Sequence, residues 1–146
     1  MILLTGDIVS QWVNFKLPFP TDFGDHQAVG FHRDGRIVCG AVFSNYRKML
    51  YGNSVDVTFA TAGPGSLTRG ALRAMFTYAF DHNVVRLQAM TAKGNLEARN
   101  LLQKLGFTLE GVVKRAWDGR SAAALYRMFP DECRWLQTPD RESLAA

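Results

Sequence analysis

Apolar residues in the middle of the chain alternate with polar or small ones, which is the pattern of a half-buried β-strand. The segment 54–61 shows the alternation most clearly, with Val55, Val57 and Phe59 on one face and Asp56, Thr58 and Ala60 on the other. Five more apolar runs predict strands at 27–32, 36–43, 84–91, 107–117 and 121–128. Asp-Gly pairs at 34–35 and 118–119 predict the turns of two hairpins.

Two other segments repeat their apolar residues every three or four positions, which predicts amphipathic helices. The first follows the Gly- and Pro-rich break 62–66, and Ser66 or Thr68 would cap it. The second begins at Asn95, a good N-cap residue, and Gly106 would end it in the left-handed conformation. Shorter helical segments are expected at 8–15 and 131–137.

The order of these segments predicts a single α/β domain that spans residues 1–146. Helices that cross over between neighbouring central strands require a sheet in which some strands run parallel. Residues 1–25 form the part that the pattern defines least, and the tail 138–146 is expected to fray.

The composition, 47% hydrophobic and 21% charged, is that of an ordinary globular protein. The formal net charge of +4 suits a phosphate-bearing partner, but the basic residues are scattered, so nucleic-acid binding is not indicated. Two cysteines without metal-ligand spacing predict reduced thiols, no metal site and a cytoplasmic location. Segment 1–7 has neither a basic leader nor a long apolar run, so we expect neither a signal peptide nor a membrane span.

The second predicted helix carries a motif in which Asn95 is followed by Ala98 and the helix ends in Leu105-Gly106-Phe107, with Glu110-Gly111 beyond. Capping alone explains each of these residue types, so the segment could be a simple connecting helix. Together with the strand, Gly-rich break and helix that precede it, however, the stretch 28–135 resembles the GCN5-related N-acetyltransferase (GNAT) superfamily. The similarity is greatest to its ribosomal-protein-alanine-acetyltransferase-like branch and to related small phage and bacterial proteins.

The resemblance implies a mixed, mostly antiparallel central sheet flanked by helices, and acetyl-CoA as co-substrate without a metal. The edge of the strand at Phe59, Ala60 and Thr61 would pair with the pantetheine amides, and Asn95 would bond the pantetheine arm. Arg99 would lie near the nucleotide phosphates.

The same resemblance places the coenzyme A pyrophosphate at the tip of the first helix. A helix N-terminus after a flexible loop offers converging N–H donors and positive potential. The candidate donors are Gly65, Ser66, Leu67, Thr68, Arg69 and Gly70. Arg69 and Arg99 would equally suit a solvated surface, where arginines are common.

The chain departs from the family pattern at two places. The family's phosphate loop reads Arg/Gln-x-x-Gly-x-Gly or Ala, whereas segment 66–71 reads Ser-Leu-Thr-Arg-Gly-Ala, with one glycine near the helix start. Many members also carry a Tyr that protonates the leaving thiolate, and the corresponding residue here is Leu102, which has no proton to donate.

Acetyl transfer to an amine requires a base, because a lysine amine has a pKa of about 10.4 and an α-amine of about 7.7–8.0. Candidates for the base or the substrate shell are Asp56, Tyr126 and Tyr46. The local pattern favours an exposed strand face for Asp56 and a core or rim position for Tyr126. By resemblance, a backbone N–H of strand 59–61 would stabilise the oxyanion.

The leading interpretation is an acetyl-CoA-dependent N-acetyltransferase that transfers the acetyl group directly to a primary amine, in a small molecule or at a protein N-terminus. The alternative is a non-catalytic GNAT-fold structural or interaction protein, for example in a phage particle, which the altered loop and Leu102 favour. A nucleic-acid-binding α/β domain is a third reading. The N-terminal region is short for the family, so a homodimer partner could complete the acceptor groove.

Overall fold

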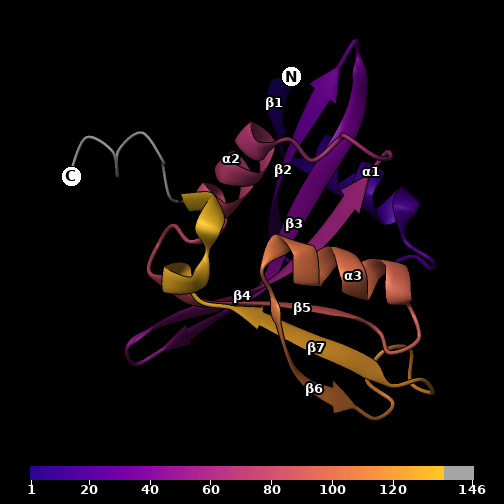
Figure 1. Ribbon diagram of the computed structural model, residues 1–146, viewed down its shortest axis with the longest axis vertical. Coiled ribbons are helices and arrows are strands. Elements are labelled where there is room, and N and C mark those ends of the chain that lie inside the picture. Colours follow the sequence, from indigo (N-terminus) through magenta and orange to yellow (C-terminus); the bar gives the residue numbers. More distant parts are fainter. Residues whose placement is uncertain (137–146) are drawn as a thin grey trace.

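The computed structural model describes residues 1–136, which form a seven-stranded sheet with helices on both faces (Figure 1). The strand order is β1-β2-β3-β4-β5-β7-β6, and every neighbouring pair is antiparallel except β4 and β5. The strands are β1 (Ile2–Thr5), β2 (His26–Arg33), β3 (Arg36–Met49), β4 (Gly52–Thr61), β5 (Val84–Ala92), β6 (Thr108–Val113) and β7 (Ala123–Met128). The helices are α1 (Asp7–Lys16), α2 (Arg69–Ala79) and α3 (Leu96–Leu105). The mixed, mostly antiparallel sheet predicted from the sequence is confirmed.

Helix α1 covers one face of β2 and β3 and lies close to their backbones. Gly30 and Gly40 are paired across the two strands, directly beneath the helix. A Cβ atom on Gly40 would lie 3.0 Å from both Val9 and Val13, so the glycines provide the space that the two valines fill. The small core on this face consists of Val9, Val13, Ala28, Val42 and Ala60.

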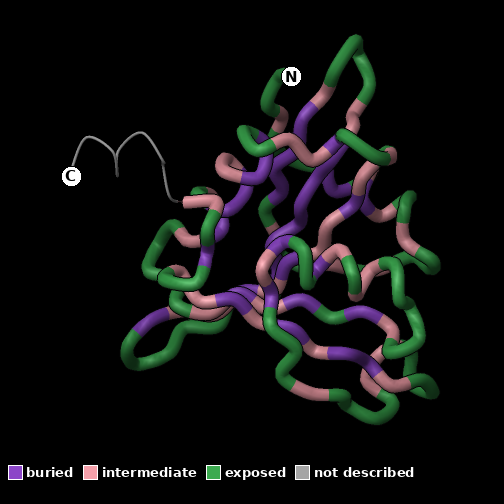
Figure 2. Tube along the Cα trace, in the orientation of Figure 1, coloured by how far each residue is buried: buried purple, intermediate pink, exposed green. Residues whose placement is uncertain are grey.

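Helices α2 and α3 pack on the opposite face and build the larger core. Figure 2 shows the buried segments of both cores. Phe76 of α2 is fully buried, and its ring centroid lies 5.9 Å from that of Phe59 and 6.2 Å from that of Phe107. Gly106 ends α3 with φ 104°, as its sequence position predicts, and turns Phe107 into this core. Within residues 1–136, no helix has the length and hydropathy needed to cross a bilayer.

The parallel strands β4 and β5 pair only over a short stretch and then diverge. Their register runs from Asn53–Val84 to Asp56–Gln88. Beyond that point β4 continues to Thr61 alongside β3, and β5 continues to Ala92 alongside β7. The sheet is therefore open between these two central strands (Figure 1).

Several boundaries differ from those predicted. Strand β3 extends to Met49 rather than ending at residue 43, because a bulge at Asn45, with φ 55°, lets the hairpin with β4 continue. The predicted strand 107–117 ends at Val113, since Arg115 adopts φ 60° and the chain turns. The C-terminal helical segment consists of two short 3-10 turns at 130–132 and 134–136. The tail 138–146 lies outside the described residues.

Candidate active site where β4 and β5 diverge

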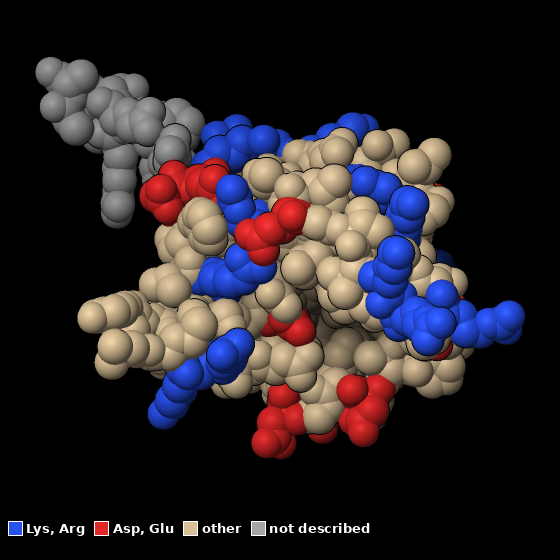
Figure 3. Space-filling model, turned by 90° about the horizontal axis from the view of Figure 1, so that it is seen from below, with Lys and Arg blue, Asp and Glu red and all other residues tan. Residues whose placement is uncertain are grey.

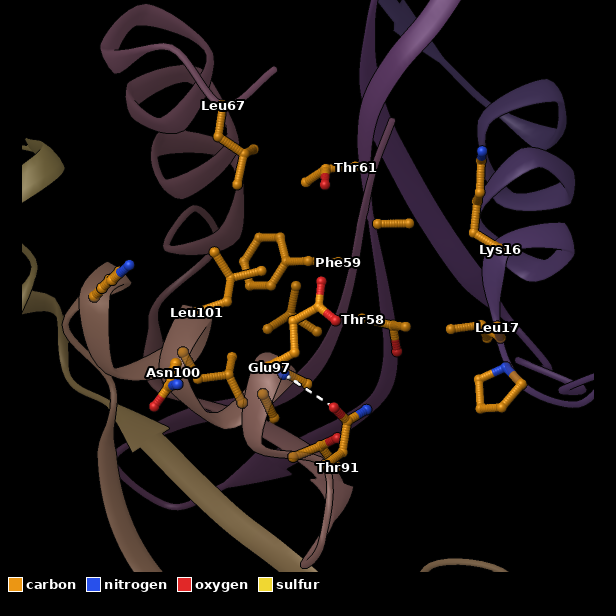
Figure 4. A pocket seen from close by; sticks show the side chains of 18 of the residues that line it. Lys16, Leu17, Thr58, Phe59, Thr61, Leu67, Thr91, Glu97, Asn100 and Leu101 are labelled. Carbon is orange, nitrogen blue, oxygen red and sulfur yellow. Dashed lines mark hydrogen bonds between the residues drawn. The ribbon is translucent and has the colours of Figure 1, made fainter. Parts of the chain in front are cut away.

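A cleft of about 780 Å³ opens where β4 and β5 diverge (Figure 4). Its walls come from segments that are far apart in the sequence. They are residues 57–61, 63–65, 67 and 89–91, the α3 residues Asn95, Glu97, Ala98, Asn100, Leu101, Leu102 and Lys104, and residues 16–18 with Trp117. In Figure 4, Phe59, Leu67 and Leu101 lie together on the side of α2 and α3, and Lys16 and Leu17 lie on the other side.

Strand β4 presents a backbone edge to this cleft. On one side it pairs with β3 as far as Thr61, but on the other side its register with β5 ends at Asp56. The N–H and C=O groups of residues 57–61 that point away from β3 therefore have no strand partner. Such an edge can hydrogen-bond another extended chain in the manner of an added strand.

The N-terminus of α2 adds further backbone donors beside the cleft. Thr68 caps the helix, because its Oγ1 accepts a hydrogen bond of 3.2 Å from the Ala71 amide and its carbonyl accepts one from Leu72. Among the described residues, the amides of Arg69 and Gly70 have no protein acceptor. Two unpaired first-turn amides at the positive end of a helix dipole are suited to an anion.

The loop that leads into α2 depends on two glycines, since Gly63 and Gly65 adopt φ values of 150° and 81°. Ser66 is turned inward and is 7% exposed, and its amide donates to the Gly63 carbonyl at 3.3 Å. Gly65 and Leu67 line the cleft. Thr68, Arg69 and Gly70 lie at the helix tip instead, where Arg69 and Gly70 are exposed and a Cβ on Gly70 would meet only open space.

Asn95 lies at the N-terminus of α3 and lines the cleft. Its Oδ1 accepts a hydrogen bond of 3.1 Å from the Ala98 amide, which is the dashed line in Figure 4. The predicted N-cap is thereby confirmed. Within the part of the chain that the structure describes, the Nδ2 group of Asn95 has no acceptor, so this donor remains for a ligand.

The structure does not bring Arg99 or Tyr126 into the cleft. The Nε of Arg99 donates to the hydroxyl of Tyr126 at 2.9 Å, and its Nη1 donates to the Lys93 carbonyl, also at 2.9 Å. Tyr126 is fully buried in the larger core. The expected roles in phosphate binding and catalysis do not fit these positions, because both side chains are engaged in holding α3 to β7.

Asp56 faces a second, smaller hollow of about 220 Å³. Its Oδ2 accepts a hydrogen bond of 2.8 Å from the Nδ2 of Asn45, the residue at the β3 bulge. Tyr46, the next residue, lines neither hollow. Partial burial, with smaller contributions from Asp81 and Tyr78, raises the pKa of Tyr46, which makes its hydroxyl a poor base at neutral pH.

Charged side chains on the neighbouring strands are paired with one another. Arg86 of β5 holds Glu110 of β6 in a bidentate ion pair, and this hydrogen bonding lowers the pKa of Glu110. Arg127 of β7 pairs with Glu132 and lies 3.6 Å from Glu110. Among the described residues Asp56 forms no ion pair, so its charge is left unneutralised by direct contact.

Sequence reasoning missed the residues that close the cleft from the side of α1. Leu17 and Pro18 follow α1, and Trp117 lies in the turn between β6 and β7. Phe19 contacts Trp117 edge-on, with ring centroids 5.4 Å apart. The Pro-rich exit from the first helix and the Asp-Gly turn beside Trp117 marked both segments as loops, but no local pattern shows that they meet.

No family model matches the chain, and no curated protein has a matching sequence. Solved structures do match. The ribosomal-protein-alanine N-acetyltransferase from Brucella melitensis aligns with a TM-score of 0.58 over 71% of this chain and 68% of its own, at 20% identity. RimJ from Mycobacterium smegmatis, in complex with CoA-disulfide, aligns with a TM-score of 0.61 over 82% of this chain and 58% of its own, at 21% identity. An acetyltransferase of the GNAT family from Streptococcus pneumoniae aligns with a TM-score of 0.62 over 88% of this chain and 99% of its own, at 16% identity.

The chain thus spans less than two thirds of the length of RimJ and nearly the whole length of the streptococcal protein. These likenesses concern the fold alone, because the three identities lie between 16% and 21%. The TM-scores of 0.58, 0.61 and 0.62 show that the chain shares their overall fold. The chain therefore has the fold of the GCN5-related N-acetyltransferases.

Proposed function

We propose that the protein is an N-acetyltransferase that uses acetyl-CoA and acts on a primary amine. The observation that carries the proposal is the free edge of β4 at residues 57–61, which borders a cleft next to the unpaired amides of α2. An extended pantetheine arm needs hydrogen-bonding groups along its length, and a diphosphate needs converging donors at one end. The cleft offers both in the required order.

The residues present fit such a ligand. Phe59, Ala60 and Thr61 would pair through their backbones with the pantetheine amides, and Asn95 would donate from Nδ2. Gly65 and Leu67 would line the path to the α2 tip, where the amides of Arg69 and Gly70 would face the diphosphate. The exposed Arg69 guanidinium would add a charge-assisted contact.

Acetyl-CoA would supply the acetyl group activated as a thioester. A backbone N–H of residues 59–61 would stabilise the negative charge that develops on the carbonyl oxygen. Asp56 would attract the acceptor ammonium and pass one of its protons to solvent through water. As the C–N bond forms and the C–S bond breaks, the second released proton goes to the sulfur. Leu102 cannot deliver that proton, so water in the cleft would.

A second candidate function is a non-catalytic interaction protein with the same fold. It is favoured by one observation: Leu102 lines the cleft and is 6% exposed, so an apolar side chain occupies the place where a proton donor would be useful. This alternative predicts that acetyl-CoA does not bind, because nothing would then maintain the free strand edge and helix tip for a ligand.

Calorimetric titration of the intact protein with coenzyme A tests the proposal. Two variants at one position sharpen the test. Arg69→Gln removes the charge alone, whereas Arg69→Pro removes the charge and the amide. Proline is tolerated here because position 69 is the first residue of α2 and Thr68 is already extended, with ψ 160°.

We expect Arg69→Gln to weaken coenzyme A binding by about three- to tenfold and Arg69→Pro to weaken it by about tenfold more, since each lost contact to a charged group is worth roughly 1–2 kcal/mol. The melting temperature of both variants should stay near that of the wild type, because the Arg69 amide has no protein acceptor within residues 1–136. Absence of binding to the wild-type protein would refute the proposal and support the interaction protein.

A further inference from the structure

The smaller hollow lies on the α1 side of the gap between β4 and β5 and adjoins the larger cleft. Both cavities share Leu17, Pro18, Val57, Thr58, Met90 and Trp117 as lining residues. The remaining lining of the smaller hollow comes from Phe19, Thr21, Asp22, Phe23, Ser44, Asn45 and Asp56. A molecule in the smaller hollow would therefore meet the acyl end of one in the larger cleft across the gap.

Three aromatic side chains, Phe19, Phe23 and Trp117, form part of the walls of the smaller hollow, alongside polar residues that include Thr21 and Thr58. Phe19 packs edge-on against Trp117 and joins the loop after α1 to the turn between β6 and β7. Asn14 fixes that loop with two hydrogen bonds to the Thr21 backbone: Nδ2 donates to the carbonyl at 2.7 Å, and Oδ1 accepts from the amide at 2.9 Å. Phe23 packs on the small core beneath α1. An anchored aromatic enclosure of this kind favours a flat apolar group.

The floor of the hollow carries a negative charge. Asp56 lines it, with Asn45 holding one carboxylate oxygen, and no Lys or Arg is among the lining residues. The nearby guanidiniums of Arg86 and Arg127 form direct ion pairs with Glu110 and Glu132, so Asp56 interacts with Arg86 only at longer range and keeps its carboxylate open to the hollow. Viewed from below, the surface is hollowed near its centre and acidic side chains lie beside the hollow and along one margin (Figure 3).

We propose that this hollow binds the acceptor, and that the acceptor is a small arylalkyl primary amine whose ammonium faces Asp56 and whose ring lies against Phe19 and Trp117. The inference rests on the proposed function and narrows its substrate class. A volume of about 220 Å³ holds on the order of ten non-hydrogen atoms, the size of 2-phenylethylamine.

The same features disfavour the two other amine classes. A protein N-terminus continues into a peptide chain that must leave the hollow, and the side chains of Leu17, Phe19 and Trp117 along its walls offer no acceptors for the peptide N–H groups. A polyamine brings further ammonium groups that need further carboxylates. The other acidic lining residue, Asp22, is exposed and already accepts a hydrogen bond from the Gly24 amide at 2.9 Å.

The experiment has a binding arm and a turnover arm, both on the full chain. Tryptophan fluorescence is titrated with 2-phenylethylamine, with and without coenzyme A, and acetylation is compared for 2-phenylethylamine, spermidine and an alanine tripeptide. The variants are Phe19→Ala and Trp117→Leu. Phe15→Ala is the matched control, because Phe15 lies on the same stretch of chain, is 85% exposed and lines neither hollow.

We expect 2-phenylethylamine to have a kcat/KM at least about tenfold above those of the other two amines, since one well-filled aromatic site discriminates by roughly that factor or more. Phe19→Ala and Trp117→Leu should raise KM for it about tenfold or more. Phe19→Ala should also leave coenzyme A affinity unchanged, because Phe19 lines only the smaller hollow, whereas Trp117 lines both cavities. Phe15→Ala should change neither quantity. Melting curves identify a variant that fails to fold. In that case the order of the wild-type kcat/KM values for the three amines tests the proposed acceptor class.

Preference for the tripeptide or for spermidine would overturn the inference while leaving the proposed function intact. So would coenzyme A binding without any response to 2-phenylethylamine. Conversely, a fluorescence response to the amine from a protein that does not bind coenzyme A would overturn the acceptor role together with the proposed function.

Discussion

The guanidinium of Arg99 donates from Nε to the hydroxyl of the fully buried Tyr126 at 2.9 Å, which links α3 to β7 across the larger core. A second donor of Arg99 reaches the Lys93 carbonyl just before Asn95. The two contacts fix the turn that presents Asn95 to the cleft. Neither residue is among those that line the cleft, so we expect both to act by holding α3 in place.

We predict that Tyr126→Phe destabilises the fold and spares the chemistry. The substitution leaves the Arg99 Nε donor without its partner, which should lower the free energy of unfolding by about 1–2 kcal/mol. Chemical denaturation measures this loss, and the turnover number should stay within about threefold of the wild type because the hydroxyl lies outside the cleft. Tyr51→Phe is the control, since Tyr51 is 88% exposed and should change neither quantity. A hundredfold loss of turnover in Tyr126→Phe would instead make Tyr126 catalytic.

Asp56 and Asn45 give the second prediction. Asp56→Asn keeps the size of the side chain but removes the charge that attracts and deprotonates the ammonium, so we expect kcat/KM to fall by about 100-fold or more. Steady-state kinetics with the amine as varied substrate would measure the fall.

Asn45 acts through Asp56 and should have a smaller effect. Asn45→Gly suits the φ of 55° at the bulge and removes only the 2.8 Å hydrogen bond to Asp56. We expect KM for the amine to rise about three- to tenfold with little change in coenzyme A affinity, because one hydrogen bond to a charged group is lost. If Asp56→Asn retained full activity, neither residue could have the role that we propose.

Local signals in the sequence were sufficient for the elements that form much of the larger cleft. Helix α3 begins after Asn95 and ends at Gly106, as capping rules predict. The alternation of residues from Val55 to Ala60 also assigns the two faces of β4 correctly. These features depend on neighbours within a few residues. Pattern reasoning succeeds there because the same short-range forces act in the folded protein.

The surroundings of the smaller hollow were not predictable in the same way. The contact between Phe19 and Trp117 joins two loops that are distant in the sequence, and neither has a periodic pattern. The bulge at Asn45 depends on the register of a long hairpin rather than on residue type. Tyr126 and Arg99 are polar residues whose partners become visible only when α3 docks on β7.

Acid sensitivity is the third prediction. The hydrogen bonds from Arg86 lower the pKa of Glu110, and those from Arg127 lower the pKa of Glu132. A carboxylate whose folded-state pKa is depressed stabilises the fold above its unfolded pKa, and this contribution is lost as the pH falls through the folded pKa. Stability should therefore decline between about pH 5 and pH 3, and the decline should be shallower in Glu110→Gln. Denaturant midpoints across that range provide the measurement.

Glu97→Gln is the control for this pH series, because Glu97 is an exposed residue of α3 without an ion pair among the described residues. Added salt should weaken the effect of Glu110, since its side chain is 39% exposed and its charge is open to screening. If the denaturant midpoint fell equally steeply with pH in the wild type and in Glu110→Gln, the Arg86–Glu110 pair would not contribute to acid stability.

The glycine pair beneath α1 gives the last prediction. A Cβ on Gly30 would lie 2.8 Å from the Cys39 carbonyl oxygen and 3.0 Å from a methyl of Val9, so Gly30→Ala must displace backbone or helix. Overpacking of this kind costs about 1–3 kcal/mol, which thermal denaturation would detect.

Gly111→Ala is the matched control, because Gly111 also lies in a strand but a Cβ there meets nothing within 4 Å. Since α1 leads directly into the loop that carries Phe19, Gly30→Ala should also weaken the binding of 2-phenylethylamine more than that of coenzyme A. Equal melting temperatures for the two variants would mean that α1 does not pack against the sheet as closely as we describe.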